Sequence, residues 1–193
     1  MWANPPPGPA PHAWRRFDRG APIGRMAAVV DTDERLRSWL VNTAERDGAA
    51  VMHVAGDEHG APYAFSVGAW RRFGKPEAVT IGLPKDVAHS VINTYVRRAA
   101  GGERFKPGQL YDGFLDGCWM TVEKVAKQHY PEFLGSAFLV YGDGDFPAVQ
   151  LIAATPDGKF PWHDDAPGGF AEYQPVLTAS GAPENWTPGS DGP

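Results

Sequence analysis

The stretch at residues 63–84, YAFSVGAWRRFGKPEAVTIGLP, constrains the fold more than any other part of the chain. Residues 62–67 and 78–83 are short apolar runs typical of strands, and Gly74 and Pro76 punctuate the loop expected between them. Pro84 precedes a continuous apolar face at helical spacing, made of Val87, Ala88, Val91, Ile92, Tyr95 and Ala99, and Gly101-Gly102 ends it. The stretch therefore predicts a strand–loop–strand unit that leads into a helix.

A second helix is predicted before this unit, over residues 33–47. Its apolar stripe consists of Leu36, Trp39, Leu40, Thr43 and Ala44. Asp31 and Glu34 have the spacing of a capping box, and Gly48 supplies the stop. We expect this helix to begin close to Asp33.

Further strands are predicted at residues 49–56, 118–125 and 147–154. Residues 102–117 are rich in turn formers, and we predict no strand or helix there. Residues 126–142 allow either a short helix after Pro131 or a loop that leads into a strand from Ala137. Two main helices and about five short strands, most of them joined by short loops, predict an α+β domain with a mainly antiparallel sheet. The helix after Pro84 is expected to cover one face of it.

The prolines mark the limits of the domain. Six of the 19 lie in residues 1–24, seven in residues 156–193, and six in the long segment between them. Segments so rich in Pro and Gly bury their backbones poorly. We therefore expect a disordered Pro-rich arm at 1–24, a single α+β domain at 25–170 and a flexible acidic tail at 171–193, with Met26 as an alternative start to Met1.

Composition limits the class of protein. The single cysteine, Cys118, excludes an internal disulfide and a zinc site built on several thiolates. The net charge of −5 argues against general nucleic-acid binding, and the +3 arm at residues 1–25 is interpreted as solvated. No window reaches the roughly 18 apolar residues of a membrane span. We expect a soluble, cytoplasmic protein without a membrane or nucleic-acid partner.

Ser66 raises the question of nucleophilic catalysis. Residues 64–68, AFSVG, are one glycine short of the nucleophile elbow of serine hydrolases. An elbow requires a helix directly after the serine, and Gly74 and Pro76 leave little room for one. We therefore interpret Ser66 as a small strand residue and Gly68 as a position that allows a bulge or a close backbone approach.

The histidines do not form a recognisable metal motif. No two of them have the i, i+4 spacing of the zinc-hydrolase helix, in a set made of His12, His53, His59, His89, His129 and His163. We expect no metal site and interpret each histidine as a surface or structural residue. The segment FPWHDD, residues 160–165, is interpreted as a lid of Phe160 and Trp162 over the sheet.

Three ordered segments, at residues 62–93, 102–117 and 146–162, resemble the bacterial family called domain of unknown function four-two-six-two, a similarity that runs from about residue 50 to residue 162. The resemblance implies a compact bacterial cytoplasmic domain and assigns no activity, cofactor or catalytic residue. Its motif positions in this chain are Tyr63, Ser66, Gly68, His89, Gln150 and Trp162.

The favoured hypothesis is a module that binds a small ligand or a protein partner, with Trp70, Trp119 and Trp162 as contact residues. Its candidate pocket consists of Tyr63, Ser66, His89, Gln150, Trp162 and His163. One alternative is a small flavin-binding enzyme, by analogy with split barrels. The other is a metal-assisted enzyme that uses His53, His89 or His163 with nearby acids. The sequence assigns no cofactor, enzyme class or oligomeric state.

Overall fold

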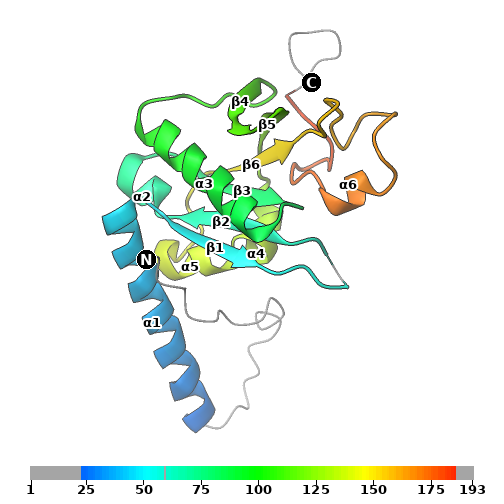
Figure 1. Ribbon diagram of the computed structural model, residues 1–193. Coiled ribbons are helices and arrows are strands. Elements are labelled where there is room, and N and C mark those ends of the chain that lie inside the picture. The colour runs from blue at the N-terminus through cyan, green and yellow to red at the C-terminus, as the bar shows by residue number, and fades with distance from the viewer. Residues whose placement is uncertain (1–22, 59, 186–193) are drawn as a thin grey trace.

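A six-stranded mixed sheet forms the centre of the structure, a computed structural model that describes residues 23–58 and 60–185 (Figure 1). The strands are β1 (Ala50–Val54), β2 (Tyr63–Val67), β3 (Glu77–Ile81), β4 (Leu110–Leu115), β5 (Cys118–Lys124) and β6 (Ala148–Ala153). They lie in the order β1-β2-β3-β6-β5-β4. All neighbours are antiparallel except β3 and β6, which run parallel. The predicted α+β class is confirmed, with one parallel pair inside a mainly antiparallel sheet.

Helices cover both faces of the sheet. On one face, α3 (Lys85–Ala100) buries Ala88, Val91 and Ile92 against the sheet, as its apolar spacing predicts. On the other face lie α1 (Ile23–Asp47) and a helical run made of η1 (Lys127–His129), α4 (Tyr130–Phe133), η2 (Gly135–Ala137) and α5 (Phe138–Tyr141). The result is a three-layer arrangement with the sheet in the middle (Figure 1).

In the second half of the chain the structure adds a strand that was not predicted and decides between two open alternatives. Residues 102–117 contain the edge strand β4, whose register shifts between Tyr111 and Leu115 around Gly113 at a positive φ of 72°. This bulge hides the strand alternation among turn formers. Of the two alternatives for residues 126–142, the helical one is correct and the strand from Ala137 is not.

The first helix is longer than predicted. It begins at Ile23, so Asp31 lies inside it and pairs with Arg35 one turn later instead of forming a capping box with Glu34. No proline follows Pro22 in this part of the chain, and the helix continues until Gly48, whose N–H donates to the Ala44 carbonyl at 2.8 Å. Of the Pro-rich arm, residues 1–22 lie outside the described residues.

A short helix, α2 (Ala69–Phe73), directly follows β2 and replaces the predicted loop. Gly74 caps its end in a left-handed conformation instead of preventing the helix. Gly68, between β2 and α2, has a φ of +123°, and a Cβ there would lie 2.3 Å from the Ala44 Cβ. The prediction that Gly68 permits a close backbone approach is therefore confirmed.

The chain returns to the sheet after β6. A short helix, α6 (Phe170–Tyr173), precedes a segment in which Gln174, Val176, Leu177 and Thr178 are buried. The expected acidic tail thus contains residues that belong to the packed body. Among the described residues, no helix combines the length and apolar character needed to cross a bilayer.

Replacing Gly68 by Ala is expected to lower the free energy of unfolding by about 2 to 5 kcal/mol, since the left-handed backbone and the overpacking against Ala44 both oppose a Cβ. Gly74→Ala is the matched control, because Gly74 also has a positive φ, +61°, but a Cβ there would meet no atom within 4 Å. Its expected cost is about 1 kcal/mol. Urea unfolding of both variants measures the difference, and equal losses would show that the approach to Ala44 does not matter.

Candidate functional site

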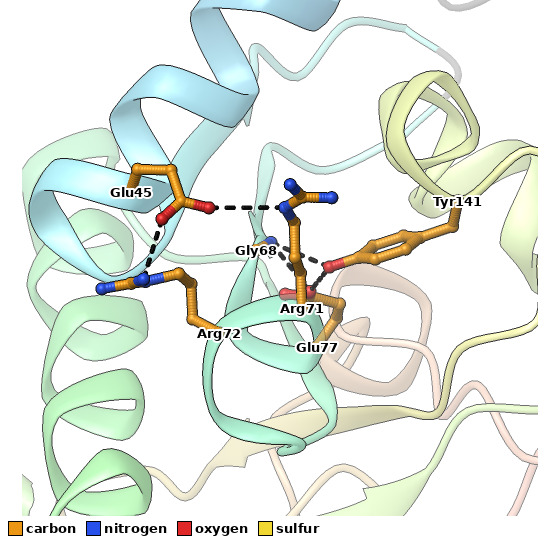
Figure 2. A network of polar contacts seen from close by, with 6 residues as sticks. All are labelled: Glu45, Gly68, Arg71, Arg72, Glu77 and Tyr141. Carbon is orange, nitrogen blue, oxygen red and sulfur yellow. Dashed lines mark hydrogen bonds and ion pairs between the residues drawn. The ribbon is translucent and has the colours of Figure 1, made fainter.

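The densest polar centre surrounds Glu77, the fully buried first residue of β3. Its carboxylate accepts hydrogen bonds from the Ser66 hydroxyl at 2.5 Å and from the Gly68 and Trp70 amides at 2.8 and 3.1 Å. The Tyr141 hydroxyl, from the end of α5, donates to the same carboxylate (Figure 2). Four donors from three different segments therefore meet one buried acid.

The local backbone explains how the acid is accommodated. The turn at Gly68 aims the free N–H groups at the start of α2 toward the carboxylate, an arrangement that suits a negative charge. Burial and the neighbouring Glu77 both raise the pKa of Tyr141, which keeps its hydroxyl protonated and able to donate. A buried carboxylate is tolerated when its oxygens receive hydrogen bonds in this way.

At the Glu77 centre, the Ser66 hydroxyl is fully engaged in hydrogen bonds and inaccessible to solvent. The Ser66 hydroxyl donates a hydrogen bond to Glu77 and accepts one from the Ala78 amide at 2.9 Å, and the side chain is fully buried. The interpretation of Ser66 as a strand residue is confirmed. On the surface nearby, Glu45 of α1 pairs with Arg71 and Arg72 of α2 (Figure 2), and exposed pairs of this kind contribute little stability.

A second polar group lies across β1, β2 and β3. His53 is directly opposite Ala64, and Ala64 is directly opposite Thr80, so the three residues form one row across the sheet. We call it the His53–Thr80 row. Ala64 belongs to the apolar cluster beneath α3, and residues aligned across neighbouring strands share a face. The row therefore faces α3.

The row contains buried polar atoms that the fold does not satisfy. Thr80 is fully buried, and its hydroxyl makes no hydrogen bond within residues 23–58 and 60–185. The His53 Nε2 is likewise buried and unbonded in this part of the chain. Buried polar groups are almost always hydrogen-bonded, and this one row carries two that, within the described residues, are not.

Charge around the row is balanced. Burial lowers the pKa of His53, Lys85 lowers it further, and Asp86 opposes the shift. The imidazole is therefore neutral at pH 7, where it can both donate and accept a hydrogen bond. Lys85 and Asp86 form the exposed first turn of α3, whose N-cap residue Pro84 provides no side-chain hydrogen bond.

The six residues of the predicted pocket have these places in the fold. Tyr63, at the start of β2, donates to the Glu132 carbonyl, and Gln150, in the middle of β6, donates to the Pro175 carbonyl. His89 lies on α3, on the other side of the sheet from Gln150, and contacts Asn93.

Ser66 lies at the Glu77 centre, whereas Trp162 and His163 follow β6 and lie edge to face, 6.2 Å apart. The structure thus brings Trp162 and His163 together, and a pocket shared by all six residues stays a prediction.

The aromatic residues expected to make contacts differ in exposure. Trp70 and Trp119 are 39% and 47% exposed, while Trp162 is partly buried and stacks on Phe160 at 5.0 Å. Phe160 packs with Ile152 of β6, consistent with the interpretation of this segment as a lid. Within the described residues, no group of three His, Cys, Asp or Glu side chains is placed to hold a metal ion.

Sequence reasoning missed both polar centres. A signal for the row was present, because Thr80 interrupts an otherwise apolar strand, but its alignment with His53 depends on the register of three strands. Glu77 gave no signal, since it follows a Lys-Pro pair that is typical of an exposed turn.

Comparison with known proteins gives one match. The family model described as Domain of unknown function (DUF4262) matches residues 43–167, a range that includes His53, Glu77 and Thr80. No curated protein and no solved structure matches the chain.

Replacing Tyr141 by Phe removes the hydroxyl that donates to Glu77 and also accepts the Gly68 amide. We expect this variant to lose about 2 kcal/mol of unfolding free energy, as is usual for a hydrogen bond to a buried charge. Tyr173→Phe is the control, because Tyr173 is half exposed. Chemical denaturation at pH 7 measures both, and a loss no larger for Tyr141→Phe than for the control would contradict the assignment.

The same hydroxyl predicts a pH dependence. The pKa of Tyr141 is raised in the folded state, so its contribution to stability is complete below the ordinary tyrosine pKa of about 10 and is lost as the pH rises above it. Wild-type stability should therefore fall more steeply above pH 10 than that of Tyr141→Phe. Parallel slopes for the two proteins in denaturation at increasing pH would exclude this coupling.

Proposed function

The chain belongs to the DUF4262 family, and we propose that it is a binding module whose small ligand occupies the His53–Thr80 row. The observation that carries this proposal is the pair of buried, unbonded polar atoms, the His53 Nε2 and the Thr80 hydroxyl. Ala64 lies between them on the row. Its small side chain belongs to the apolar cluster under α3.

The ligand class follows from the charges. A neutral imidazole and a hydroxyl can exchange hydrogen bonds with a ligand but cannot neutralise one that carries a net charge. Burying an unpaired ion costs far more than burying a polar group that is hydrogen-bonded. Lys85 and Asp86 carry opposite charges and remain exposed. An uncharged molecule with hydrogen-bonding groups, such as an amide or an alcohol, therefore suits the row best.

Binding is favoured over catalysis because the row has one titratable side chain, His53, and the strand β2 separates it from the Thr80 hydroxyl. General acid–base chemistry at a single group needs a second reactive centre within hydrogen-bond reach. A flavin-binding or metal-assisted enzyme is the alternative hypothesis, and its tests are an absorption band near 450 nm and elemental analysis of the untagged protein.

Thr80→Val tests whether the hydroxyl is left for a ligand. Valine keeps the shape of threonine and removes a group that the fold leaves unbonded, so the ligand-free protein should gain about 1 kcal/mol of stability or stay unchanged. Thr121→Val is the matched control, because the buried Thr121 hydroxyl donates to the Gln109 carbonyl at 2.9 Å. This control should lose about 1 kcal/mol in denaturant unfolding.

If Thr80→Val loses as much stability as Thr121→Val, the Thr80 hydroxyl serves the fold and the proposal fails.

Ligand class is tested by nuclear magnetic resonance of the His53 imidazole during titration with small probes. Acetamide and glycerol should shift the His53 signals, and acetate and methylammonium should not. Thr80→Val should weaken the acetamide response, whereas Thr121→Val should preserve it. Equal responses to all four probes, or a response that survives Thr80→Val, would rule out the row as the binding site.

A further inference from the structure

The last described part of the chain, residues 174–185, lies on the sheet face opposite α3, over β5 and β6. We call it the C-terminal strap. Gln150 and Glu123 mark this face, because they alternate along their strands with Val122, Val149 and Leu151, which pack beneath α3. In Figure 1 the strap is the orange-to-red part of the chain that returns beside these strands. It covers a row of polar side chains.

Three two-point contacts hold the strap, and all are polar. Gln150 donates to the Pro175 carbonyl at 2.7 Å and accepts the Leu177 amide at 2.8 Å. In return, Gln174 accepts the Ala153 amide at 3.0 Å and donates to the Ala153 carbonyl at 2.9 Å. Each glutamine thus binds the backbone of the opposite segment as a neighbouring strand would.

Glu123 makes the third contact. Its carboxylate accepts the Asn185 side-chain amide at 2.8 Å and the Asn185 backbone N–H at 3.3 Å. Glu123 and Gln150 are direct cross-strand neighbours, and both are buried. The strap therefore supplies neutral hydrogen-bond donors to this carboxylate and no opposite charge.

Two apolar anchors, Val176 and Leu177, complete the contact. Leu177 is 2% exposed and joins the core cluster on this face, and its carbonyl accepts the Ala126 amide at 2.8 Å. Val176 packs with Ile152 and Phe160, and the chain bends after Leu177. A short segment held through its backbone, with side chains in apolar sites, is the way groove domains bind peptides. The strap and its face have the same organisation within one chain.

The residues matched by the family model include the β5–β6 face but not the strap. Residues 43–167 include Glu123, Gln150 and Ala153, whereas the strap lies entirely beyond them. Buried polar side chains on a sheet face are costly unless they have partners, but each hydrogen bond to the strap contributes only about 1 kcal/mol net, because water replaces it on release. A segment held this way can be exchanged for another.

We propose that the β5–β6 face is a recognition site for a protein segment with a glutamine three residues before a leucine, and that the strap is its occupant in cis. A partner segment of the same pattern would displace the strap. A partner with Lys in place of Asn185, eight residues after the leucine, should bind more tightly, since its charge would pair with Glu123.

The test uses the full chain and a fluorescently labelled peptide of residues 174–185, QPVLTASGAPEN. Leu177→Asp in the protein should expel its own strap, because a charge cannot enter the apolar anchor site. We expect this variant to bind the peptide at least tenfold more tightly than the wild-type chain does, by fluorescence anisotropy. An Asn185→Lys peptide should bind tighter still, and the advantage should vanish with Glu123→Gln in the protein.

Gln150→Leu, added to Leu177→Asp, should weaken peptide binding at least tenfold, whereas the exposed control Gln109→Leu should not change it. A folded Leu177→Asp protein that binds no peptide would overturn the proposal. Gln174→Ala, which removes two hydrogen bonds of the strap and adds no charge, is a second variant in case Leu177→Asp unfolds. If amide exchange shows that β5 and β6 open in both variants, the strap is an integral part of the core and the proposal fails as well.

Discussion

The buried Glu77 carboxylate is the interaction on which the rest of the structure depends. It accepts hydrogen bonds from β2 through Ser66, from the start of α2 through Gly68 and Trp70, and from α5 through Tyr141. An acid without these donors could not stay buried at the start of β3. The sharp turn at Gly68 follows from the same requirement, because it places two backbone amides where the carboxylate needs them. That turn also brings β2 and α2 against Ala44 of α1.

Three groups of buried polar residues differ in which part of the chain supplies their hydrogen-bond partners. We use this difference to distinguish a structural group from candidate binding sites. The Glu77 centre is complete within the body of the domain. The polar face of Glu123 and Gln150 is complete only while the strap lies on it. The His53–Thr80 row is incomplete in the described residues. The first group stabilises the fold, and the other two are the places where we propose that a peptide and a small ligand bind.

The sequence predicts the elements well where periodicity is strong and poorly where contacts distant in sequence decide. The apolar faces of α1 and α3 and the strands β1, β2, β3, β5 and β6 follow from local patterns. The helix α2 was missed because five residues between two glycines resemble a loop, and β4 because a bulge breaks its alternation. The His53–Thr80 row depends on strand register, and the polar β5–β6 face depends on a tail that returns to the sheet. Neither leaves a local signal, although Thr80 and Gln150 both interrupt apolar strands.

Native-state hydrogen exchange of the Gly68 and Trp70 amides tests the central claim most directly. Both amides lie at the start of a five-residue helix, where no helical partner exists and exchange would ordinarily be fast. If Glu77 accepts both bonds in a closed centre, these amides should exchange as slowly as those of β6, through global unfolding alone. Exchange at the rate of an exposed helix end would contradict the account, because the carboxylate would then not hold β2, α2 and α5 together.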